Sequence, residues 1–241
     1  MSKTRKIKTI MFLFASALMV YDTAAYAASL NPITAIDVAL EPDSTMIQRA
    51  ETVNARLRMS YPKGFALDKK HHPHVTCLQR YVRTADLDKI YSAVGTVLNE
   101  ENLAAWKLKA FKYYYIPWKD LGLAGIVVEP TDNLVRFQQK LIDVIAPYTE
   151  KTGTAKAFVT TAKQPEINQP TIDYVASYVP EYSDKNFNPH VTVGLDTQAA
   201  LNKMLAEPFE EFTFSPVGVS VYQLGDFGTV RKKLKGWEFK P

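Results

Sequence analysis

The chain contains one cysteine among its 241 residues, and it lacks several patterns that mark common enzyme sites. A single cysteine, Cys77, excludes an intrachain disulfide, and its place in an apolar stretch predicts a buried side chain. No Gly-x-Ser-x-Gly segment is present, which disfavours a serine hydrolase with a nucleophile elbow. A glycine-rich phosphate loop and a His-Glu-x-x-His zinc helix are also absent from the sequence, which disfavours two frequent routes to phosphate and metal chemistry.

Long apolar runs are scarce too, and the most notable one lies near the N-terminus. Residues 1–27 combine a basic start, an apolar run from about Ile10 to Val20, and the small residues of Ala25-Tyr26-Ala27. That order is typical of a secretory signal peptide cleaved after Ala27, so we expect a periplasmic or secreted protein. An uncleaved N-terminal anchor is the alternative. No later segment is long and apolar enough to cross a bilayer, so we expect no membrane attachment after cleavage.

The rest of the chain has no large excess of charge of either sign. The full sequence carries 29 lysines and arginines against 25 aspartates and glutamates. Removing residues 1–27 takes away four cations and one anion, which leaves a net charge of +1. Charge therefore gives no support for binding a long polyanion or duplex nucleic acid, although a local cluster of donors can still hold a small anion. We further expect a monomer.

Hydrophobic periodicity predicts an α+β chain built from two related halves. In the first half a strand over 33–40 ends in Glu41-Pro42, and a helix follows over about 43–59 with Asp43 or Ser44 as its N-cap. In the second half a strand over 123–128 ends in Glu129-Pro130 before a helix over about 132–148. A strand that begins His-Val-Thr comes later in each half. The remaining predicted elements are helices over 85–98 and 197–206 and strands over 106–116, 210–215, 217–224 and 228–235.

This duplication predicts two pseudo-symmetric lobes, each an antiparallel sheet with helices packed on its outer face. We expect residues 28–241 to form this bilobal domain, with lobes that are not contiguous in sequence. The second His-Val-Thr follows its Glu-Pro by 60 residues and the first by 32, so the second half carries about 28 extra residues within 150–189. Long insertions are often lids or binding loops, and this one ends directly at the second tripeptide. It contains four aromatic residues, Tyr174, Tyr178, Tyr182 and Phe187.

Histidine is also scarce, and two of the four histidines occupy matching positions. His74 and His190 each begin the tripeptide His-Val-Thr, and each follows a proline. Side chains alternate along a strand, so His74 and Thr76 project from one face, as do His190 and Thr192. The valine between them points to the opposite face, where it can pack under helices.

Histidine and threonine in this pattern suit the cleavage of a phosphodiester. An ordinary histidine has a pKa of about 6.5, so it can accept or donate a proton near neutral pH. The reaction needs a base for the attacking oxygen and an acid for the leaving oxygen, and two histidines can divide these roles. Threonine hydroxyls can donate to the non-bridging oxygens of the phosphate. We therefore predict one metal-independent site with His74 and His190 as catalytic residues and Thr76 and Thr192 as phosphate-binding residues.

The paired His-x-Thr motifs at 74–76 and 190–192, set in duplicated strand–helix units, resemble the 2H phosphoesterase superfamily. That group includes 2′-5′ RNA ligase-like proteins and cyclic nucleotide phosphodiesterases. In topology the resemblance covers most of the chain after residue 27, but only the two motifs are specific.

The resemblance implies an active-site groove between the lobes, with the two motifs facing each other across it, and no metal or nucleotide cofactor. The implied substrate is a 2′,3′-cyclic or 2′-5′-linked phosphodiester of a small nucleotide or short RNA fragment. Acid and base exchange roles with the direction of such a reaction, so the motifs do not assign them. The export signal and the insertion depart from the family pattern and leave the identity of the substrate open.

Three further tyrosines are candidates for contacting the substrate. Simple alternation along the strand at 106–116 places Tyr113 and Tyr115 on an aromatic and basic face, which could stack a base and attract a phosphate. Tyr222, on a later strand, is a similar candidate. The alternative for this face is an ordinary solvated surface of a sheet.

Two other functional classes stay open on the sequence. One is a non-catalytic module that keeps the fold in order to bind a nucleotide. The other is a periplasmic metal-binding protein that uses the cluster of His71, His72 and His74, because clustered histidines bind zinc or copper. The cluster is interrupted by Pro73 and has no cysteine among its members, which disfavours this reading.

Overall fold

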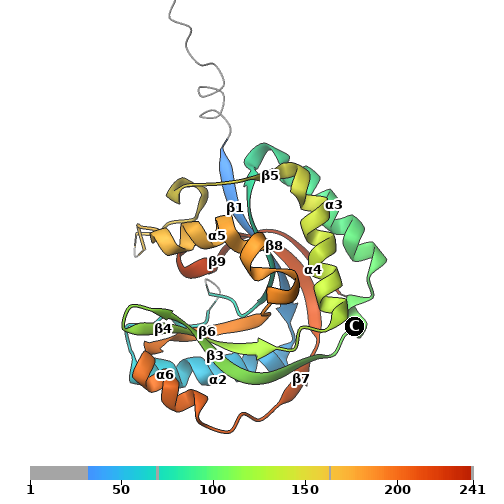
Figure 1. Ribbon diagram of the computed structural model, residues 1–241. Coiled ribbons are helices and arrows are strands. Elements are labelled where there is room, and N and C mark those ends of the chain that lie inside the picture. Colours follow the sequence, from blue (N-terminus) through green and yellow to red (C-terminus); the bar gives the residue numbers. More distant parts are fainter. Residues whose placement is uncertain (1–31, 69–70, 163, 240–241) are drawn as a thin grey trace, which may run out of the picture. The chain divides into compact units, whose positions relative to one another are not determined.

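The computed structural model describes residues 32–68, 71–162 and 164–239 (Figure 1). The predicted signal peptide and its cleavage site lie outside these residues. Nine strands in the described part form one antiparallel sheet: β1 (Ile33–Pro42), β2 (Val75–Arg83), β3 (Leu108–Trp118), β4 (Leu121–Val128), β5 (Thr149–Glu150), β6 (His190–Thr197), β7 (Phe212–Phe214), β8 (Pro216–Leu224) and β9 (Val230–Glu238). The same described residues form five α-helices: α2 (Ser44–Ser60), α3 (Leu87–Glu100), α4 (Asp132–Ile145), α5 (Gln169–Tyr182) and α6 (Gln198–Leu205).

The sheet consists of two lobes that meet along one short seam. The strand order is β7-β3-β4-β6-β2-β1-β8-β9, with β5 paired to β2. Apart from the short strands β5 and β7, neighbouring strands within each lobe pair at seven or more positions, whereas β2 and β6 pair only through Val75 and Val191. We call β2, β1, β8, β9 and β5 the first lobe, and β6, β4, β3 and β7 the second. The expected α+β class with two pseudo-symmetric antiparallel lobes is confirmed.

The first helix of each lobe packs on the sheet of the other lobe. Helix α2 follows β1 in the first lobe but packs mainly on β6 in the second. Helix α4 follows β4 in the second lobe and packs on β2 in the first, beside α3. Helix α6 covers β3, β4 and β6. The two Glu-Pro junctions thus occupy equivalent places, as the sequence repeat predicts.

Helix α2 forms where its sequence signals predict it. Asp43 is the N-cap, and its carboxylate accepts hydrogen bonds from the backbone amides of Thr45 and Met46. Loss of such a cap costs about 0.5–2 kcal/mol. The buried positions Met46, Ala50, Val53 and Leu57 recur at helical spacing and face the core. The helix therefore places one apolar face against the sheet beneath the second motif.

Helix α5 (Gln169–Tyr182) lies inside the predicted insertion, where we expected a lid or a binding loop. Asn168 caps its N-terminus by accepting a hydrogen bond from the Thr171 amide, at 2.8 Å. Pro170 stands in the first turn, where a missing amide hydrogen costs nothing. Tyr174, Tyr178 and Tyr182 follow at intervals of four residues, which is the periodicity that could have revealed the helix.

Within the residues that the structure describes, no helix combines the length and apolar character needed to span a bilayer.

Candidate active site

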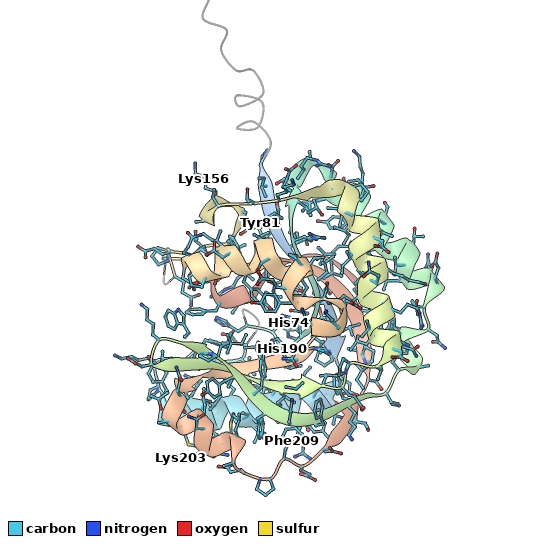
Figure 2. The ribbon with its side chains drawn as sticks, viewed as in Figure 1. His74, Tyr81, Lys156, His190, Lys203 and Phe209 are labelled. Carbon is cyan, nitrogen blue, oxygen red and sulfur yellow. The ribbon has the colours of Figure 1, made fainter. Side chains whose placement is uncertain are left out.

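The two tripeptides meet at the seam between the lobes. Val75 and Val191, their central residues, form the pair that joins β2 to β6, and both are fully buried. His74 and His190 therefore emerge next to each other at the centre of the molecule, between α5 and the strands of the second lobe (Figure 2). His74, Thr76, His190 and Thr192 all line one cavity. Secondary structure alone could not place these residues together, because 116 positions separate the two histidines in sequence.

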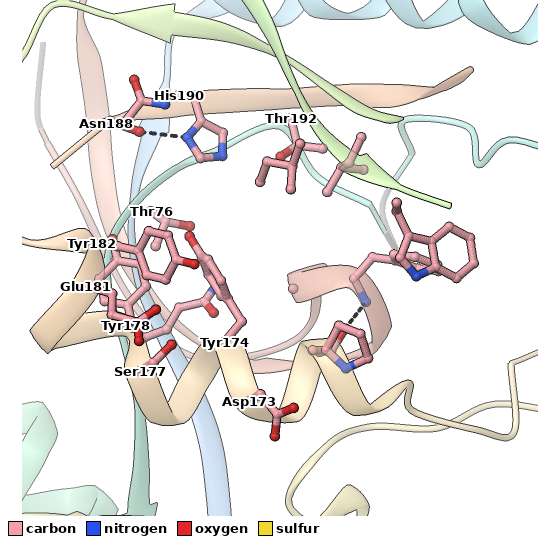
Figure 3. Close-up of a pocket in the computed structure, with 18 of the residues that line it drawn as sticks. Thr76, Asp173, Tyr174, Ser177, Tyr178, Glu181, Tyr182, Asn188, His190 and Thr192 are labelled. Carbon is pink, nitrogen blue, oxygen red and sulfur yellow. Dashed lines mark hydrogen bonds between the residues drawn. The ribbon is translucent and has the colours of Figure 1, made fainter. Parts of the chain in front are cut away.

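Both histidine rings are held in the same way. The Nδ1 atom of His74 lies 2.7 Å from the carbonyl oxygen of His72, and that of His190 lies 2.7 Å from the carbonyl oxygen of Asn188 (Figure 3). A carbonyl oxygen can only accept, so each Nδ1 carries a hydrogen. In its neutral form each ring then has a basic Nε2, and in its protonated form that Nε2 is an acid. Either ring can therefore transfer a proton.

A β-bulge follows each motif at the equivalent position. Cys77 is the extra residue where β2 pairs with β1, and Val193 is the extra residue where β6 pairs with β4. Each is the third residue after its histidine. A bulge disrupts the ladder locally and bends the strand, which is a common device for aiming side chains next to a site. The side chain of Cys77 is fully buried, as predicted.

A buried amide from the crossing helix binds the carbonyl oxygen of each bulged residue. Gln138 of α4 donates from Nε2 to the Cys77 carbonyl at 3.0 Å, and Asn54 of α2 donates from Nδ2 to the Val193 carbonyl at 2.8 Å. Both amide side chains are at least 95% buried. An unpaired buried carbonyl would cost about 1–3 kcal/mol, so these bonds fix each helix against the strand that carries the motif of the other lobe.

Asp37 breaks the symmetry between the two motifs. This fully buried carboxylate on β1 accepts hydrogen bonds at Oδ2 from the Thr76 hydroxyl, at 2.7 Å, and from Gln79 Nε2, at 2.9 Å. The same oxygen lies 3.8 Å from Nε2 of His74. Burial raises the pKa of Asp37, and the attraction of His74 and the two hydrogen bonds oppose that rise. Sequence reasoning missed Asp37, because a lone acid in an apolar strand carries no motif.

His190 has an aromatic neighbour, and among the described residues it has no carboxylate partner comparable to Asp37 beside His74. Its ring packs against the edge of Tyr114, with ring centroids 4.7 Å apart. The pKa of His190 is lowered to about 4, chiefly because the ring is buried; the hydrogen bond to Asn188 opposes this shift, and the nearby His74 adds a smaller lowering. At neutral pH His190 is therefore an uncharged imidazole with a free lone pair on Nε2.

The structure corrects the expectation for Tyr113 and Tyr115. Phe111 is an extra residue where β3 pairs with β4, and this bulge reverses the alternation that we assumed. Tyr113 packs on Phe209, and the Tyr115 hydroxyl donates to Asn202 of α6 at 2.9 Å. Neither tyrosine lines the cavity, and Tyr114 lines it in their place.

Gly125, opposite Tyr114 on β4, makes room for that ring. A Cβ atom at Gly125 would lie 2.4 Å from the Tyr114 ring, which is closer than two carbon atoms can approach. The smallest residue therefore lets Tyr114 lie between β4 and His190.

Tyr222 also lies outside the cavity, in a buried network beside it. Its hydroxyl donates to Glu41, which also accepts from Nε2 of His72, at 2.8 Å, and from Nζ of Lys233, at 3.0 Å. Burial opposes ionisation of Glu41, but these hydrogen bonds and one from Ser220 outweigh it and hold the pKa of Glu41 below its usual value. The carbonyl oxygen of His72 binds Nδ1 of His74, so the hydrogen bond from His72 to Glu41 also helps to hold His74 in place.

The three clustered histidines have separate surroundings. His71 stacks on Phe65, with ring centroids 4.8 Å apart, His72 binds Glu41, and His74 lines the cavity. Across the described ranges there is no group of three or more histidine, cysteine, aspartate or glutamate side chains placed to hold a metal ion. The observed geometry therefore offers no argument for the metal-binding alternative.

The cavity has a volume of about 660 Å³, which is large enough for a nucleotide-sized ligand. His190 and Thr192 lie on one side of the cavity, and Tyr174, Tyr178 and Tyr182 of α5 face them across it (Figure 3). Trp118 from the second lobe and Phe227 from the first touch edge to face, with ring centroids 4.9 Å apart. The expectation that the insertion covers the groove is therefore supported by the position of α5.

Asp226 fixes α5 over the motifs. Its Oδ1 accepts hydrogen bonds from the backbone and side-chain amides of Asn168, at 2.9 and 2.7 Å, and from the Thr171 hydroxyl, at 3.3 Å. The next residue, Phe227, has a left-handed backbone with φ of 58°, which costs a non-glycine residue about 1 kcal/mol. The turn between β8 and β9 thus holds the N-terminus of α5 and presents an aromatic ring to the cavity.

One solved bacterial structure shares this fold, and a second gives a weaker match. TT0787 of Thermus thermophilus has a TM-score of 0.51 and 15% sequence identity, and the match covers 85% of this chain and 97% of that one. Escherichia coli LigT gives TM-scores of 0.46 in complex with 3′-AMP and 0.43 in complex with ATP, each at 12% identity and covering 87% of this chain and 99% of LigT. At 15% identity the match to TT0787 shows a likeness of fold, which agrees with the two-lobed fold expected from the motifs. The sequence matches no protein-family model and no curated protein.

Proposed function

We propose that the protein is a metal-independent phosphodiesterase that cleaves its substrate by acid–base catalysis with His74 and His190. The observation that carries this proposal is the matched pair of imidazoles at the seam, each with Nδ1 bound to the carbonyl oxygen two residues earlier. Such a pair leaves two proton-transferring nitrogens in one cavity. The candidate substrates are a 2′,3′-cyclic or a 2′-5′-linked nucleotide, each of which has one phosphodiester phosphorus to place between the rings.

The different surroundings of the two histidines suggest their roles in hydrolysis. His190 is uncharged at neutral pH, so it suits the base that removes a proton from the attacking water. His74 lies beside the Asp37 carboxyl group, which can balance the positive charge of a protonated ring, so it suits the acid. The water oxygen bonds to phosphorus, the bond from phosphorus to the leaving oxygen breaks, and His74 protonates that oxygen. A 2′,3′-cyclic phosphate would thus give a phosphate monoester.

The two threonines should make unequal contributions. The Thr192 side chain forms no hydrogen bond among the described residues, so its hydroxyl is free to donate to the phosphate, whereas the Thr76 hydroxyl donates to Asp37. Loss of one donor to a developing oxyanion costs about 10²–10³-fold in kcat. Thr192→Val should therefore lower kcat by up to that factor with little change in the free energy of unfolding. Thr76→Val should lower that free energy by about 1–2 kcal/mol, because the buried carboxyl group loses a partner.

Steady-state kinetics and denaturant unfolding of the two valine variants give the comparison. If Thr76→Val lost more activity than Thr192→Val at unchanged stability, the assignment of the free hydroxyl to Thr192 would be wrong.

The pH dependence of the reaction should report the lowered pKa of His190. A base acts only when unprotonated, so the rising limb of kcat/KM should climb about tenfold per pH unit below pH 4 and end near that pH. A base with an ordinary imidazole pKa would instead give a rising limb that ends near pH 6.5. The measurement is a profile of kcat/KM from pH 3 to 9, restricted to conditions in which the protein stays folded. A rising limb centred near 6.5 would contradict the role given to His190.

A substrate screen of the purified protein tests the function itself. Adenosine and cytidine 2′,3′-cyclic phosphates, 2′-5′ dinucleotides and bis(4-nitrophenyl) phosphate would be incubated with the protein in the presence of EDTA. We expect turnover of at least one diester that EDTA does not reduce. Ligation would be tested by adding a 5′-hydroxyl acceptor to the cyclic phosphate. Binding of these ligands without any turnover would favour the non-catalytic module, and loss of all activity in EDTA would contradict metal independence.

We also propose that the protein acts outside the cytoplasm, as a periplasmic or secreted enzyme. The support is the order of basic, apolar and small residues over 1–27. Expression of the full chain in a bacterial host should yield an exported protein whose N-terminal sequence begins at Ala28. Recovery of the full-length chain from the cytoplasm or the membrane would contradict this prediction.

A further inference from the structure

The charges that line the cavity are unusual for a site that handles phosphate. Among the described residues that line it, none is lysine or arginine, and two carry carboxylates, Asp173 and Glu181. Neither carboxylate forms an ion pair with a basic side chain in the described part of the chain. His190 is uncharged at neutral pH. Apart from a protonated His74, the cavity therefore offers a substrate only negative charge and neutral hydrogen-bonding groups.

Both carboxylates lie on α5, at the exposed rim. Asp173, Ser177 and Glu181 follow one another at intervals of four residues and form a polar row along the helix. Tyr174 and Tyr182 are each the next residue along, and their ring centroids are 4.5 Å apart. Burial raises the pKa of Tyr182 and the charge of Glu181 adds to that rise, so this carboxylate lies beside an aromatic ring at the rim.

Aromatic rings with nearby carboxylates form the kind of surface that binds quaternary ammonium groups. The face of an aromatic ring attracts a cation, and the attraction strengthens when water is excluded. Here Tyr174 and Tyr182 contribute rings from α5, and Trp118 and Phe227 contribute rings from the two lobes. The Nζ atom of Lys119 lies 5.2 Å from the centroid of the Trp118 ring, so this ring already interacts with one cation. Lys119 itself does not line the cavity.

We propose that the site favours a phosphodiester whose ester group carries a positive charge, such as a choline ester. This inference rests on the proposed function and concerns the substrate class of that same site. The phosphate of such a diester would lie between the motifs, and its ammonium group would lie against α5 and the carboxylates at the rim. The zwitterion as a whole is uncharged, so it would enter a cavity lined by carboxylates without the repulsion that extra phosphates would meet.

A matched pair of substrates isolates the positive charge. 4-Nitrophenyl phosphocholine and 4-nitrophenyl 3,3-dimethylbutyl phosphate have nearly the same shape, because a carbon atom replaces the ammonium nitrogen in the second. In each reaction water adds to phosphorus, the bond to the nitrophenyl oxygen breaks, and nitrophenol is released with phosphocholine or dimethylbutyl phosphate. We expect kcat/KM to be about tenfold higher for the choline ester at low salt.

Variants at the rim should separate this preference from catalysis. In Glu181→Gln, and further in the double variant Asp173→Asn with Glu181→Gln, the ratio of the two kcat/KM values should fall at least threefold. The fall in this ratio should come from the choline ester, whose kcat/KM drops more than that of the uncharged ester. Glu51→Gln is the matched control, because it removes an exposed carboxylate of α2 that lies outside the cavity. In Glu51→Gln the ratio of kcat/KM for the choline ester to kcat/KM for the uncharged ester should equal that of the unaltered protein.

Failure of the inference can be told apart from failure of the function. Equal kcat/KM values for the two esters, unaffected by the rim variants, would overturn the inference and leave the phosphodiesterase in place. If no diester at all were cleaved, the proposed function would fail, and calorimetric binding would still test the inference. Phosphocholine should then bind about tenfold more tightly than 3,3-dimethylbutyl phosphate, and equal affinities would overturn the inference.

Discussion

Replacing either motif histidine by alanine is expected to lower kcat by about 10²–10⁴-fold, because we propose that each ring carries out one of the two proton transfers. In this proposal His190→Ala removes the base and His74→Ala removes the acid. Residues that act as a unit show non-additive losses, so the double variant should be little slower than the slower single variant. The measurement is the steady-state rate on the best diester of the screen, with the melting temperature of each variant recorded beside it.

The matched control for the histidine variants is Asn186→Ala. Asn186 is exposed and lies four residues before His190, outside the cavity. Its replacement should leave both the rate and the melting temperature unchanged. Retention of full activity in either alanine variant would refute acid–base catalysis by this pair. Loss of activity together with a large fall in melting temperature would show a structural role for the histidine and would contradict our assignment.

Asp37→Asn is expected to lower activity at least tenfold while leaving the protein equally stable or more stable at pH 7. The asparagine oxygen can still accept from Thr76 and Gln79, so the hydrogen bonds persist. What disappears is the negative charge beside His74, which we expect to stabilise the protonated ring. The prediction therefore tests charge rather than hydrogen bonding.

The sign of the stability effect follows from the raised pKa of Asp37. Burial makes the folded state hold the Asp37 proton more strongly than the unfolded chain does. Stability from this group is therefore complete below the unfolded pKa of about 4, and it is lost as pH rises through the folded pKa. Asparagine cannot ionise and avoids this loss. Each 1 kcal/mol gained should raise the melting temperature at pH 7 by about 2–4 °C, and the gain should vanish near pH 4.

A second buried carboxylate provides the control for Asp37→Asn. Asp196 on β6 is 2% exposed, and the cavity lining does not include it. Asp196→Asn should leave kcat/KM unchanged. If Asp37→Asn kept full activity, or if its gain in melting temperature were the same at pH 4 and pH 7, the role given to this carboxyl group would be wrong.

Local sequence signals were reliable where they acted within one element. The Glu-Pro junctions, the Asp43 cap and the spacing of Met46, Ala50 and Leu57 predicted β1 and α2 with little error at their ends. They also predicted two lobes, because the same strand–helix unit occurs twice. The helix at 169–182 was missed because prolines and polar residues suggested a loop, although its tyrosines recur every fourth residue.

Predictions that depended on strand register were less reliable. Alternation correctly put the valines of both motifs in the core and their histidines and threonines in the cavity. The same rule misplaced Tyr113 and Tyr115, because one extra residue at Phe111 reverses every side chain that follows it. A bulge depends on pairing with a partner strand, so the sequence of a single strand does not reveal it.

The sequence by itself determined the chemistry that this protein can offer: two histidines and two threonines, each set on alternate positions of a strand. Their duplication also determined that the two halves would fold alike. Only the tertiary structure decided that Val75 pairs with Val191, that Asp37 lies beside one motif alone, and that α5 closes the cavity with tyrosines and carboxylates. These features differ in kind from the motifs because each joins residues far apart in the chain. Burial, charge and hydrogen bonding at the site depend on distance in space, which local periodicity does not encode.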